Sequence, residues 1–152
     1  MSEEQSKAQI LVDICKNKYV GSNISNCNYF VDDVARELGH KSFSGRNANS
    51  IVDFLDASSA SWTEVSGKDA AMSAAQGVLV IAGLRSWEYK HPKSTHGHGH
   101  VAIVIPGPLY LGKYPKVYCG GGPGGQSEGK KSSGEVWREE DRNQVHYYKA
   151  LW

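Results

Sequence analysis

Residues 26–39 read NCNYFVDDVARELG, and this stretch predicts an amphipathic helix with a cysteine in its first turn. The apolar residues recur at the spacing of one buried helical face, at Phe30, Val31, Val34, Ala35 and Leu38. We expect Asn26 to cap the helix start by accepting a hydrogen bond from a free backbone N–H, and Gly39 to end the helix. Cys27 then lies at the positive end of the helix dipole, which favours the nucleophilic thiolate.

A single cysteine is weak evidence for chemistry, because free cysteine often only fills space in a core. The second feature lies about seventy residues further on, where residues 98–105 read HGHVAIVI and predict a strand beginning at His100. A cysteine on a helix followed by a histidine on a strand is the order typical of papain-like hydrolases. The pattern therefore predicts Cys27 as a nucleophile and His100 as its general base.

Composition limits the possible functions. With 152 residues, 39% of them hydrophobic, the chain is expected to form one domain spanning 1–152. Seventeen basic and 16 acidic residues give a net charge of +1, which favours neither nucleic acid nor an anionic membrane as a partner. No apolar run approaches the ~18 residues that cross a bilayer, and residues 1–7 lack the apolar core of a signal peptide. The three cysteines argue against a disulfide scaffold.

The remaining patterns predict helices first and strands later. Helices are expected over 8–18, around 51–55 and over 69–76, and strands over 62–65, 78–82, 116–119 and 145–151. In the first helix, Ile10, Leu11, Ile14 and Cys15 should face the core. Residues 83–99 read as an exposed loop beside the nucleophile, and the glycines of 120–125 exclude regular structure. This order predicts the α+β class with an antiparallel sheet.

Two motifs in the sequence resemble parts of cofactor-binding sites. His96, His98 and His100 alternate, so they would share one face and could bind a metal if the strand extended back that far, but the sequence supplies no Cys-x-x-Cys or His-Glu-x-x-His to complete a site. Residues 124–130 match G-x-x-x-x-G-K, yet Lys131 replaces the required Ser or Thr, and residues 132–134 are a poor helix start. We expect no metal and no organic cofactor.

Short segments along nearly the whole chain together resemble one known family. Besides the Cys27 helix they are NAN at 47–49, AAQGVLVIAGL at 74–84, GHVA at 99–102, GPLY at 107–110, GQS at 125–127, and VW at 136–137 before YY at 147–148. In this order they resemble the first family of bacterial type VI secretion amidase effectors.

The resemblance implies a papain-like, NlpC-type fold, with N-terminal helices and a nucleophile at a helix start packed on an antiparallel sheet. It implies cleavage of the γ-D-glutamyl to meso-diaminopimelate bond in peptidoglycan stem peptides of rival bacteria, with Cys27 as nucleophile and His100 as base. It also implies export by the type VI machinery without a cleaved signal peptide, action in the target's periplasm, and a cognate periplasmic immunity protein. We expect a monomer without membrane insertion.

The chain departs from the family pattern in three places. The loop before His100 is longer by several residues, Asn28 and Tyr29 stand where small residues are usual, and the cysteine pair that some members carry near the termini is missing. These departures concern the width of the cleft and the substrate range.

A third group should orient His100 from the strand that follows it, as in papain-like folds generally. Val117 and Cys119 share one side of that strand, so Cys119 is the polar candidate if this side faces the site. Because a thiol is a weak hydrogen-bond partner, its contribution should be modest, or a backbone carbonyl should replace it. Backbone N–H groups at the helix start, including that of Cys27, are the expected oxyanion donors.

Two other functions stay open at this point. One is a metal- or carbohydrate-binding module that uses His96, His98 and His100, with aromatic side chains stacking on sugar. The other is an intracellular papain-like thiol hydrolase, which would keep the chemistry and change the substrate.

Overall fold

A six-stranded antiparallel sheet organises the computed structural model, which describes residues 3–121 and 125–152. The strand order is β1-β6-β2-β3-β4-β5, and every neighbouring pair is antiparallel. The strands are β1 (Trp62–Val65), β2 (Val80–Leu84), β3 (His100–Val104), β4 (Lys116–Cys119), β5 (Ser127–Ser132) and β6 (His146–Ala150). The predicted α+β class with an antiparallel sheet is confirmed.

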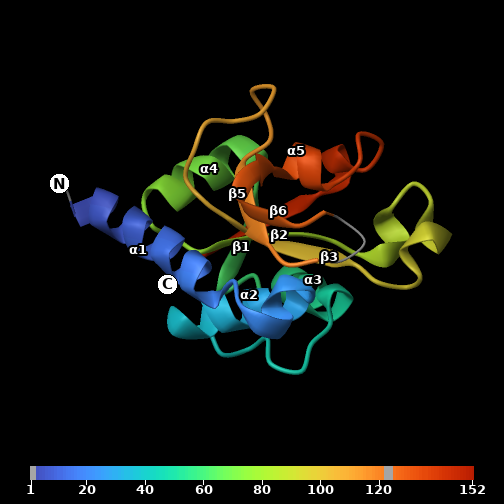
Figure 1. The fold of residues 1–152 in the computed structure, drawn as a ribbon, viewed down its shortest axis with the longest axis horizontal. Helices are drawn as coiled ribbons and strands as arrows, with labels where there is room; N and C mark the ends of the chain where they lie inside the picture. Colours follow the sequence, from blue (N-terminus) through green and yellow to red (C-terminus); the bar gives the residue numbers. More distant parts are fainter. Residues whose placement is uncertain (1–2, 122–124) are drawn as a thin grey trace.

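Helices cover both faces of this sheet. The α-helices are α1 (Glu3–Lys18), α2 (Cys27–Glu37), α3 (Ala48–Ala57), α4 (Gly67–Ala75) and α5 (Ser133–Val136). Short 3₁₀ turns are η1 (Gly21–Ile24), η2 (Ser86–Glu88), η3 (Pro92–Thr95) and η4 (Arg142–Gln144). Figure 1 shows α2 and α3 below the strands and α4 and α5 above them. Because both faces are covered, every residue of β2 and β3 is buried.

The helix α2 joins the N-terminal half of the chain to the sheet. Its predicted buried face is confirmed, since Phe30, Val31, Val34 and Ala35 are fully buried and α2 packs against β3 and β4. Burying each side chain of the size of Phe30 or Val31 contributes roughly 1.5–3 kcal/mol. The helix ends at Glu37 with Leu38 as its C-cap, and Gly39 follows with a φ of +91° that suits glycine, as its expected role as the stop signal requires. This packing fixes the start of α2 relative to β3.

The buried face of α1 differs from the prediction. Leu11 and Cys15 are fully buried as expected, but Ile10 is 53% exposed. The buried stripe runs through Leu11 and Cys15, four residues apart, and Ile10 lies about 100° around the helix from Leu11, toward solvent. Cys15 is a core residue, and all three cysteines are free.

The segment from 83 to 99 is only partly an exposed loop. Residues 83 and 84 belong to β2, and Ser86, Tyr89 and Thr95 are buried. The segment folds on itself through η2 and η3, and the Thr95 hydroxyl donates to the carbonyl of Pro92 at 2.7 Å. Because its backbone groups are paired by local hydrogen bonds, this segment can bury side chains without forming a long helix or a strand. In Figure 1 it projects to the right of the sheet.

The stretch after residue 125 also differs from the prediction. Residues 132–134 are a poor helix start by sequence, yet α5 begins at Ser133 because the Glu135 carboxylate accepts the Ser132 N–H at 2.9 Å. The edge strand β5 was not predicted, since its alternation is broken by Gly129 and by charged residues. Part of the predicted irregular glycine run, residues 122–124, lies outside the described residues.

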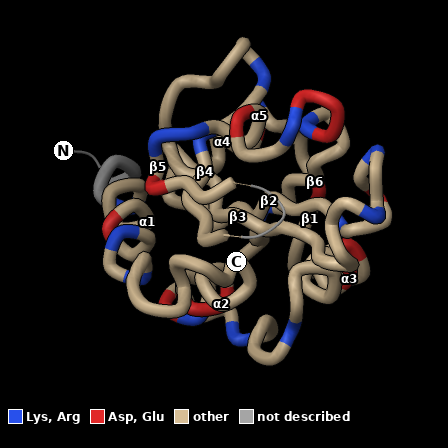
Figure 2. The backbone as a smooth tube through the Cα atoms, turned by 45° about the vertical axis from the view of Figure 1, so that its right-hand side comes forward, with Lys and Arg blue, Asp and Glu red and all other residues tan. Residues whose placement is uncertain are grey.

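Charged residues of both signs are mixed along the backbone. Figure 2 shows segments with Lys and Arg interspersed with segments carrying Asp and Glu, in keeping with the net charge of +1. Within residues 3–121 and 125–152, no helix has both the length and the apolar character needed to cross a membrane.

Candidate active site

Cys27 opens α2 and is 5% exposed, at the edge of a cleft. The expected cap is wrong in its detail: Asn26 is the N-cap residue, but its side chain donates to the carbonyl of Ser22 at 2.8 Å and caps no helical N–H. The side chain turns back toward η1, where the Ser22 carbonyl also accepts the Ser25 N–H at 3.3 Å. The N–H of Cys27 donates to the carbonyl of Gly121 at 3.0 Å. In this structure that N–H is therefore engaged and not free as an oxyanion donor.

Gly120 and Gly121, which follow β4, lie directly beside the start of α2. The Gly121 N–H donates to the carbonyl of Ile24 at 2.8 Å, so Gly121 is paired with this segment through both of its backbone groups. At Gly120 an added Cβ would overlap the carbonyl oxygen of Asn23. Because residue 120 is glycine, the end of β4 can lie close to the segment that leads into Cys27.

His100 is the first residue of β3 and is fully buried, as the predicted strand start requires. Its ring lies edge-on to Trp137 with centroids 5.1 Å apart, and the Trp137 Nε1 donates to the Tyr89 hydroxyl at 2.9 Å. Burial lowers the pKa of His100 to about 4, and the nearby Gly125 carbonyl opposes this shift. The imidazole is therefore neutral at neutral pH and able to accept a proton.

Neither ring nitrogen of His100 has a hydrogen-bond partner among the described residues. The imidazole thus makes no hydrogen bond to Cys27 in this structure. The N–H of Val101, which follows His100 in β3, bonds the Cys27 sulfur and lowers its pKa, so the thiol lies against the start of β3. Unbonded nitrogens on a fully buried imidazole are unusual and are typical of a functional site.

Burial outweighs the helix dipole at Cys27. Desolvation raises the pKa of the thiol to about 11, although backbone N–H groups of Val101 and Asn28 oppose it. The expected thiolate is therefore not the resting form of Cys27. Removing the charged sulfur from water costs more free energy than its interaction with the first turn of α2 provides. Because the thiol and the imidazole are both neutral at rest, nucleophilic attack by Cys27 requires transfer of a proton from the sulfur.

Cys119 ends β4 and is fully buried. Ile103 pairs with Tyr118 and Val104 with Val117, and continuing this register sets Cys119 opposite Ala102, on the same face as His100. Diagonal neighbours of this kind lie about 7–8 Å apart. The predicted side of β4 therefore faces His100.

The predicted hydrogen bond from Cys119 to the imidazole is absent. The Cys119 thiol donates to the carbonyl of Gly125 at 3.3 Å, and its one proton cannot serve two acceptors. Burial, and then the charge of Cys27, raise the pKa of Cys119 well above its usual value. The Gly125 carbonyl accepts the Cys119 proton and also raises the pKa of His100, so this carbonyl lies near the imidazole without a hydrogen bond to either ring nitrogen.

The cleft beside Cys27 has a volume of about 520 Å³. Its described lining carries amides, hydroxyls and imidazoles and has no Asp, Glu, Lys or Arg; it comprises Ser25, Asn26, Cys27, Asn28, Tyr29, Asn47, Ala48, Asn49, Ser94, Thr95, His96, Gly97, His98, Gly99 and Gly121. Uncharged donors and acceptors of this kind suit a ligand rich in amide groups. The segment before His100 supplies one wall, as predicted.

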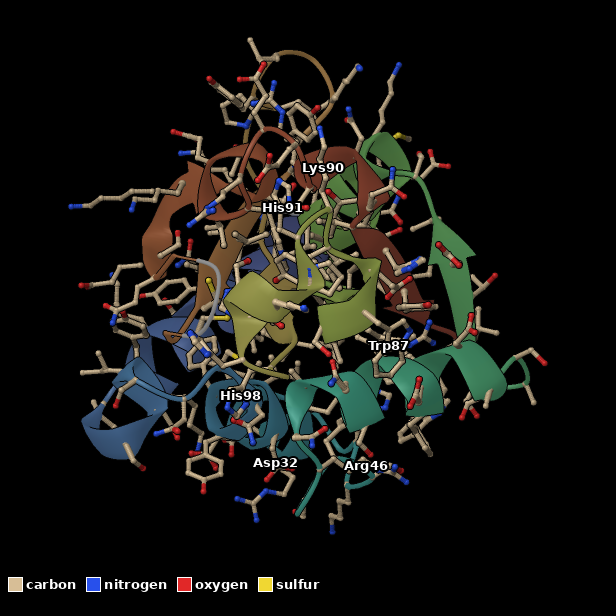
Figure 3. All side chains as sticks on the ribbon, turned by 90° about the vertical axis from the view of Figure 1, so that its right-hand side faces the viewer. Asp32, Arg46, Trp87, Lys90, His91 and His98 are labelled. Atoms are coloured by element: carbon tan, nitrogen blue, oxygen red, sulfur yellow. The ribbon has the colours of Figure 1, made fainter. Side chains whose placement is uncertain are left out.

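His96 and His98 line this cleft but do not share a strand face with His100. The strand begins only at His100, and His96 ends η3 with a φ of +53°. Figure 3 shows His98 in front of α2, consistent with its place in the cleft. Across residues 3–121 and 125–152 there is no group of three or more side chains arranged to hold a metal ion.

Sequence reasoning missed four residues that build this region: Asn49, Tyr89, Gly125 and Trp137. Asn49 and Tyr89 lie in stretches without hydrophobic periodicity, and their contacts are with residues far along the chain. The short segments NAN, GQS and VW contain or adjoin three of the four, which was the one available signal.

The chain was compared with known proteins. No model of a known protein family matches it. It is 47% identical over 149 residues to the peptidoglycan amidase Tse1 of Pseudomonas aeruginosa, and the match covers 92% of this chain and 88% of that protein.

Proposed function

We propose that this chain, which belongs to the family of the peptidoglycan amidase Tse1, is a peptidoglycan amidase that acts as an antibacterial type VI secretion effector. The observation that carries the proposal is the buried Cys27 at the start of α2, which opens into the cleft and lies against the strand that begins with His100. The 47% identity over nearly the whole chain supports the same substrate class.

The proposed bond is the amide between γ-D-glutamate and meso-diaminopimelate in a stem peptide. The family resemblance supplies this assignment, and the cleft supports it through the amides and hydroxyls that line it. A peptide of this kind presents several amide groups that such side chains can bond.

The reaction begins with a proton transfer. His100, neutral because burial lowers its pKa to about 4, accepts the Cys27 proton as the sulfur attacks the amide carbonyl carbon. Catalytic hydrogen bonds are often long before substrate binds, which fits an imidazole that has no partner here. The C=O electron pair moves to oxygen and gives a tetrahedral intermediate.

The intermediate then collapses in two stages. Because the Cys27 N–H is bonded to Gly121, the Asn28 N–H, which bonds the Cys27 sulfur at rest, is the helix-start donor assigned to the oxyanion once that sulfur attacks, and one such donor is worth about 3 kcal/mol. Protonated His100 gives its proton to the leaving diaminopimelate nitrogen as the C–N bond breaks, leaving a thioester on Cys27. Water, deprotonated by His100, attacks this thioester and releases a free glutamate carboxylate and the thiol.

Cys119 is assigned a supporting role in the site. Its bond to the Gly125 carbonyl keeps that carbonyl beside His100, where it can accept the ring N–H and select the productive tautomer. Cys119 thus acts on His100 through the Gly125 carbonyl.

The wider assignments follow from family membership. We assign an NlpC-type fold, one domain over residues 1–152 and a monomer. We also assign delivery by the type VI machinery to the target's periplasm and a cognate immunity protein there. The α+β architecture, with a cysteine at a helix start packed on an antiparallel sheet, supports the fold assignment.

The test is digestion of purified diaminopimelate-type sacculi followed by mass spectrometry of the fragments. We expect fragments that end at D-glutamate with a free γ-carboxyl, and no effect of EDTA. Fragments cut elsewhere would overturn the bond assignment, and strong inhibition by EDTA would favour a metal-dependent reaction. Expression in the periplasm should be toxic and expression in the cytosol mild; equal toxicity would instead favour an intracellular thiol hydrolase.

A further inference from the structure

Asn49, in the second position of α3, uses its whole side-chain amide to bind the segment before His100. Its Oδ1 accepts the Ser86 N–H at 2.8 Å, and its Nδ2 donates to the Ser86 hydroxyl at 3.1 Å and to the Gly97 carbonyl at 3.2 Å. The two partners are 11 residues apart along the chain. One side chain therefore ties both ends of the segment to α3.

The contact with Gly97 falls at the part of the segment that faces the cleft. His96 and His98 flank Gly97, both are exposed, and both line the cleft that contains Cys27. Asn49 lines the same cleft, and its Oδ1 is so close to Gly99 that a Cβ there would overlap it. In Figure 3, which looks onto this segment, Trp87 lies by α3 and His98 lies in front of α2.

Other parts of the segment have their own anchors, including the ion pairs of Arg85 with Asp53 and Asp56 of α3. Among the described residues, Asn49 is the one side chain of α3 that makes a hydrogen bond to residues 96–99. Thr95 holds the turn together internally, through its bond to the Pro92 carbonyl and through the His98 N–H, which donates to the Thr95 carbonyl at 3.0 Å. These bonds keep the turn folded but do not attach it to α3. The bond from Asn49 to Gly97 sets where the folded turn lies relative to the cleft.

We infer that Asn49 is a positioning residue for substrate binding, which holds His96–Gly97–His98 as one wall of the Cys27 cleft. The inference rests on the proposed function, since the wall is assigned to the stem peptide. His98 and His96 present imidazoles, which can bond a carboxylate or an amide of such a peptide.

The placement of His100 does not depend on Asn49. His100 pairs with Leu84 in the ladder between β2 and β3, and that ladder continues through Ile103. Losing the Asn49 contacts should therefore move the wall and leave the base where it is. The expected kinetic result is weaker substrate binding with nearly unchanged chemistry.

The test compares variants on a soluble stem peptide. Asn49→Asp is nearly the same shape and keeps the acceptor for Ser86, but it cannot donate to the Gly97 carbonyl. We expect Asn49→Asp and Asn49→Ala each to raise KM about tenfold, with kcat within about twofold of wild type. Ser86→Ala should raise KM about twofold, and adding it to Asn49→Ala should have no further effect, because the two act through one contact.

The matched control is Ser58→Ala, which removes one side-chain hydrogen bond from the other end of α3, where Ser58 donates to the Phe54 carbonyl at 2.6 Å. Its KM should equal that of wild type. Alkylation of Cys27 by iodoacetamide should proceed within about twofold of the wild-type rate in Asn49→Ala, since the dyad is unmoved. An unchanged KM in Asn49→Asp, or a fall in kcat with slower alkylation, would overturn the inference.

A readout without substrate separates this inference from the proposed function. Amide hydrogen exchange at His98, protected here by its bond to Thr95, should be faster in Asn49→Ala than in wild type or Ser58→Ala. If sacculi are not cut but exchange at His98 rises, the wall is held by Asn49 and the substrate assignment fails. If exchange is unchanged, the positioning role itself fails.

Discussion

Replacing Gly120 with alanine should destabilise the junction that places Cys27. The added Cβ would overlap the carbonyl oxygen of Asn23 and lie 3.2 Å from that of Asn26. Both are backbone atoms of the segment leading into α2, so no side-chain rotation relieves the clash. Overpacking of this kind costs about 1–3 kcal/mol, and we expect a loss of about 3 kcal/mol in the free energy of unfolding.

The neighbouring glycine provides the matched control. At Gly121 an added Cβ would lie 3.3 Å from the Nε2 of Gln126, a flexible side-chain atom, and 3.5 Å from the Cα of Ser25. Gly121→Ala should therefore change the free energy of unfolding by less than about 0.5 kcal/mol, helped by the reduced entropy of the unfolded chain.

Urea unfolding of both variants measures the difference. For a chain of this size, 3 kcal/mol corresponds to a fall in Tm of roughly 6–12 °C, so a thermal melt provides a second readout. If Gly120→Ala unfolds within about 0.5 kcal/mol of wild type, β4 does not approach the start of α2 as closely as described.

Three further predictions concern the site itself. Because burial lowers the pKa of His100 to about 4, kcat/KM should fall on the acid side only near that pH, and a midpoint near 6.5 would indicate a solvated imidazole. The same shift should make the fold less stable as pH falls from about 6.5 toward 4, since the unfolded chain binds a proton that the buried ring does not; urea titrations over this range check the sign. Cys119→Ser should keep most activity because a hydroxyl can still donate to Gly125, whereas Cys119→Leu should lose most of it by crowding His100. Initial rates of stem-peptide hydrolysis measure the activity of both Cys119 variants. Full activity of Cys119→Leu would show that Cys119 is not part of the site.

The α2 helix and the start of β3 were predictable because each carries a strong local pattern. The apolar residues of α2 repeat at helical spacing over three turns, and β3 is an apolar run that begins at one polar residue, His100. Local periodicity decides such elements, so Cys27 and His100 could be located without tertiary information.

The details that required the structure are those decided by distant contacts. The Asn26 side chain could either cap α2 or bond Ser22, and the backbone path of η1 decides between them. The protonation state of the Cys27 thiol depends on its burial against the sheet. The effect of this burial on the pKa outweighs that of the helix dipole, which the sequence does predict. Asn49 bonds residues 37 and 48 positions away, and no local pattern predicts such pairs.

The central claim is that the Cys27 thiol is the nucleophile. Its most direct test is the rate of stem-peptide hydrolysis by Cys27→Ala, compared with Cys15→Ala, which removes a second buried thiol that does not line the cleft. Circular dichroism and urea unfolding should show that both variants remain folded. We expect Cys27→Ala to be slower than wild type by at least about a thousandfold and Cys15→Ala to be within about twofold. Retention of more than about 5% of wild-type activity by a folded Cys27→Ala variant would contradict the account.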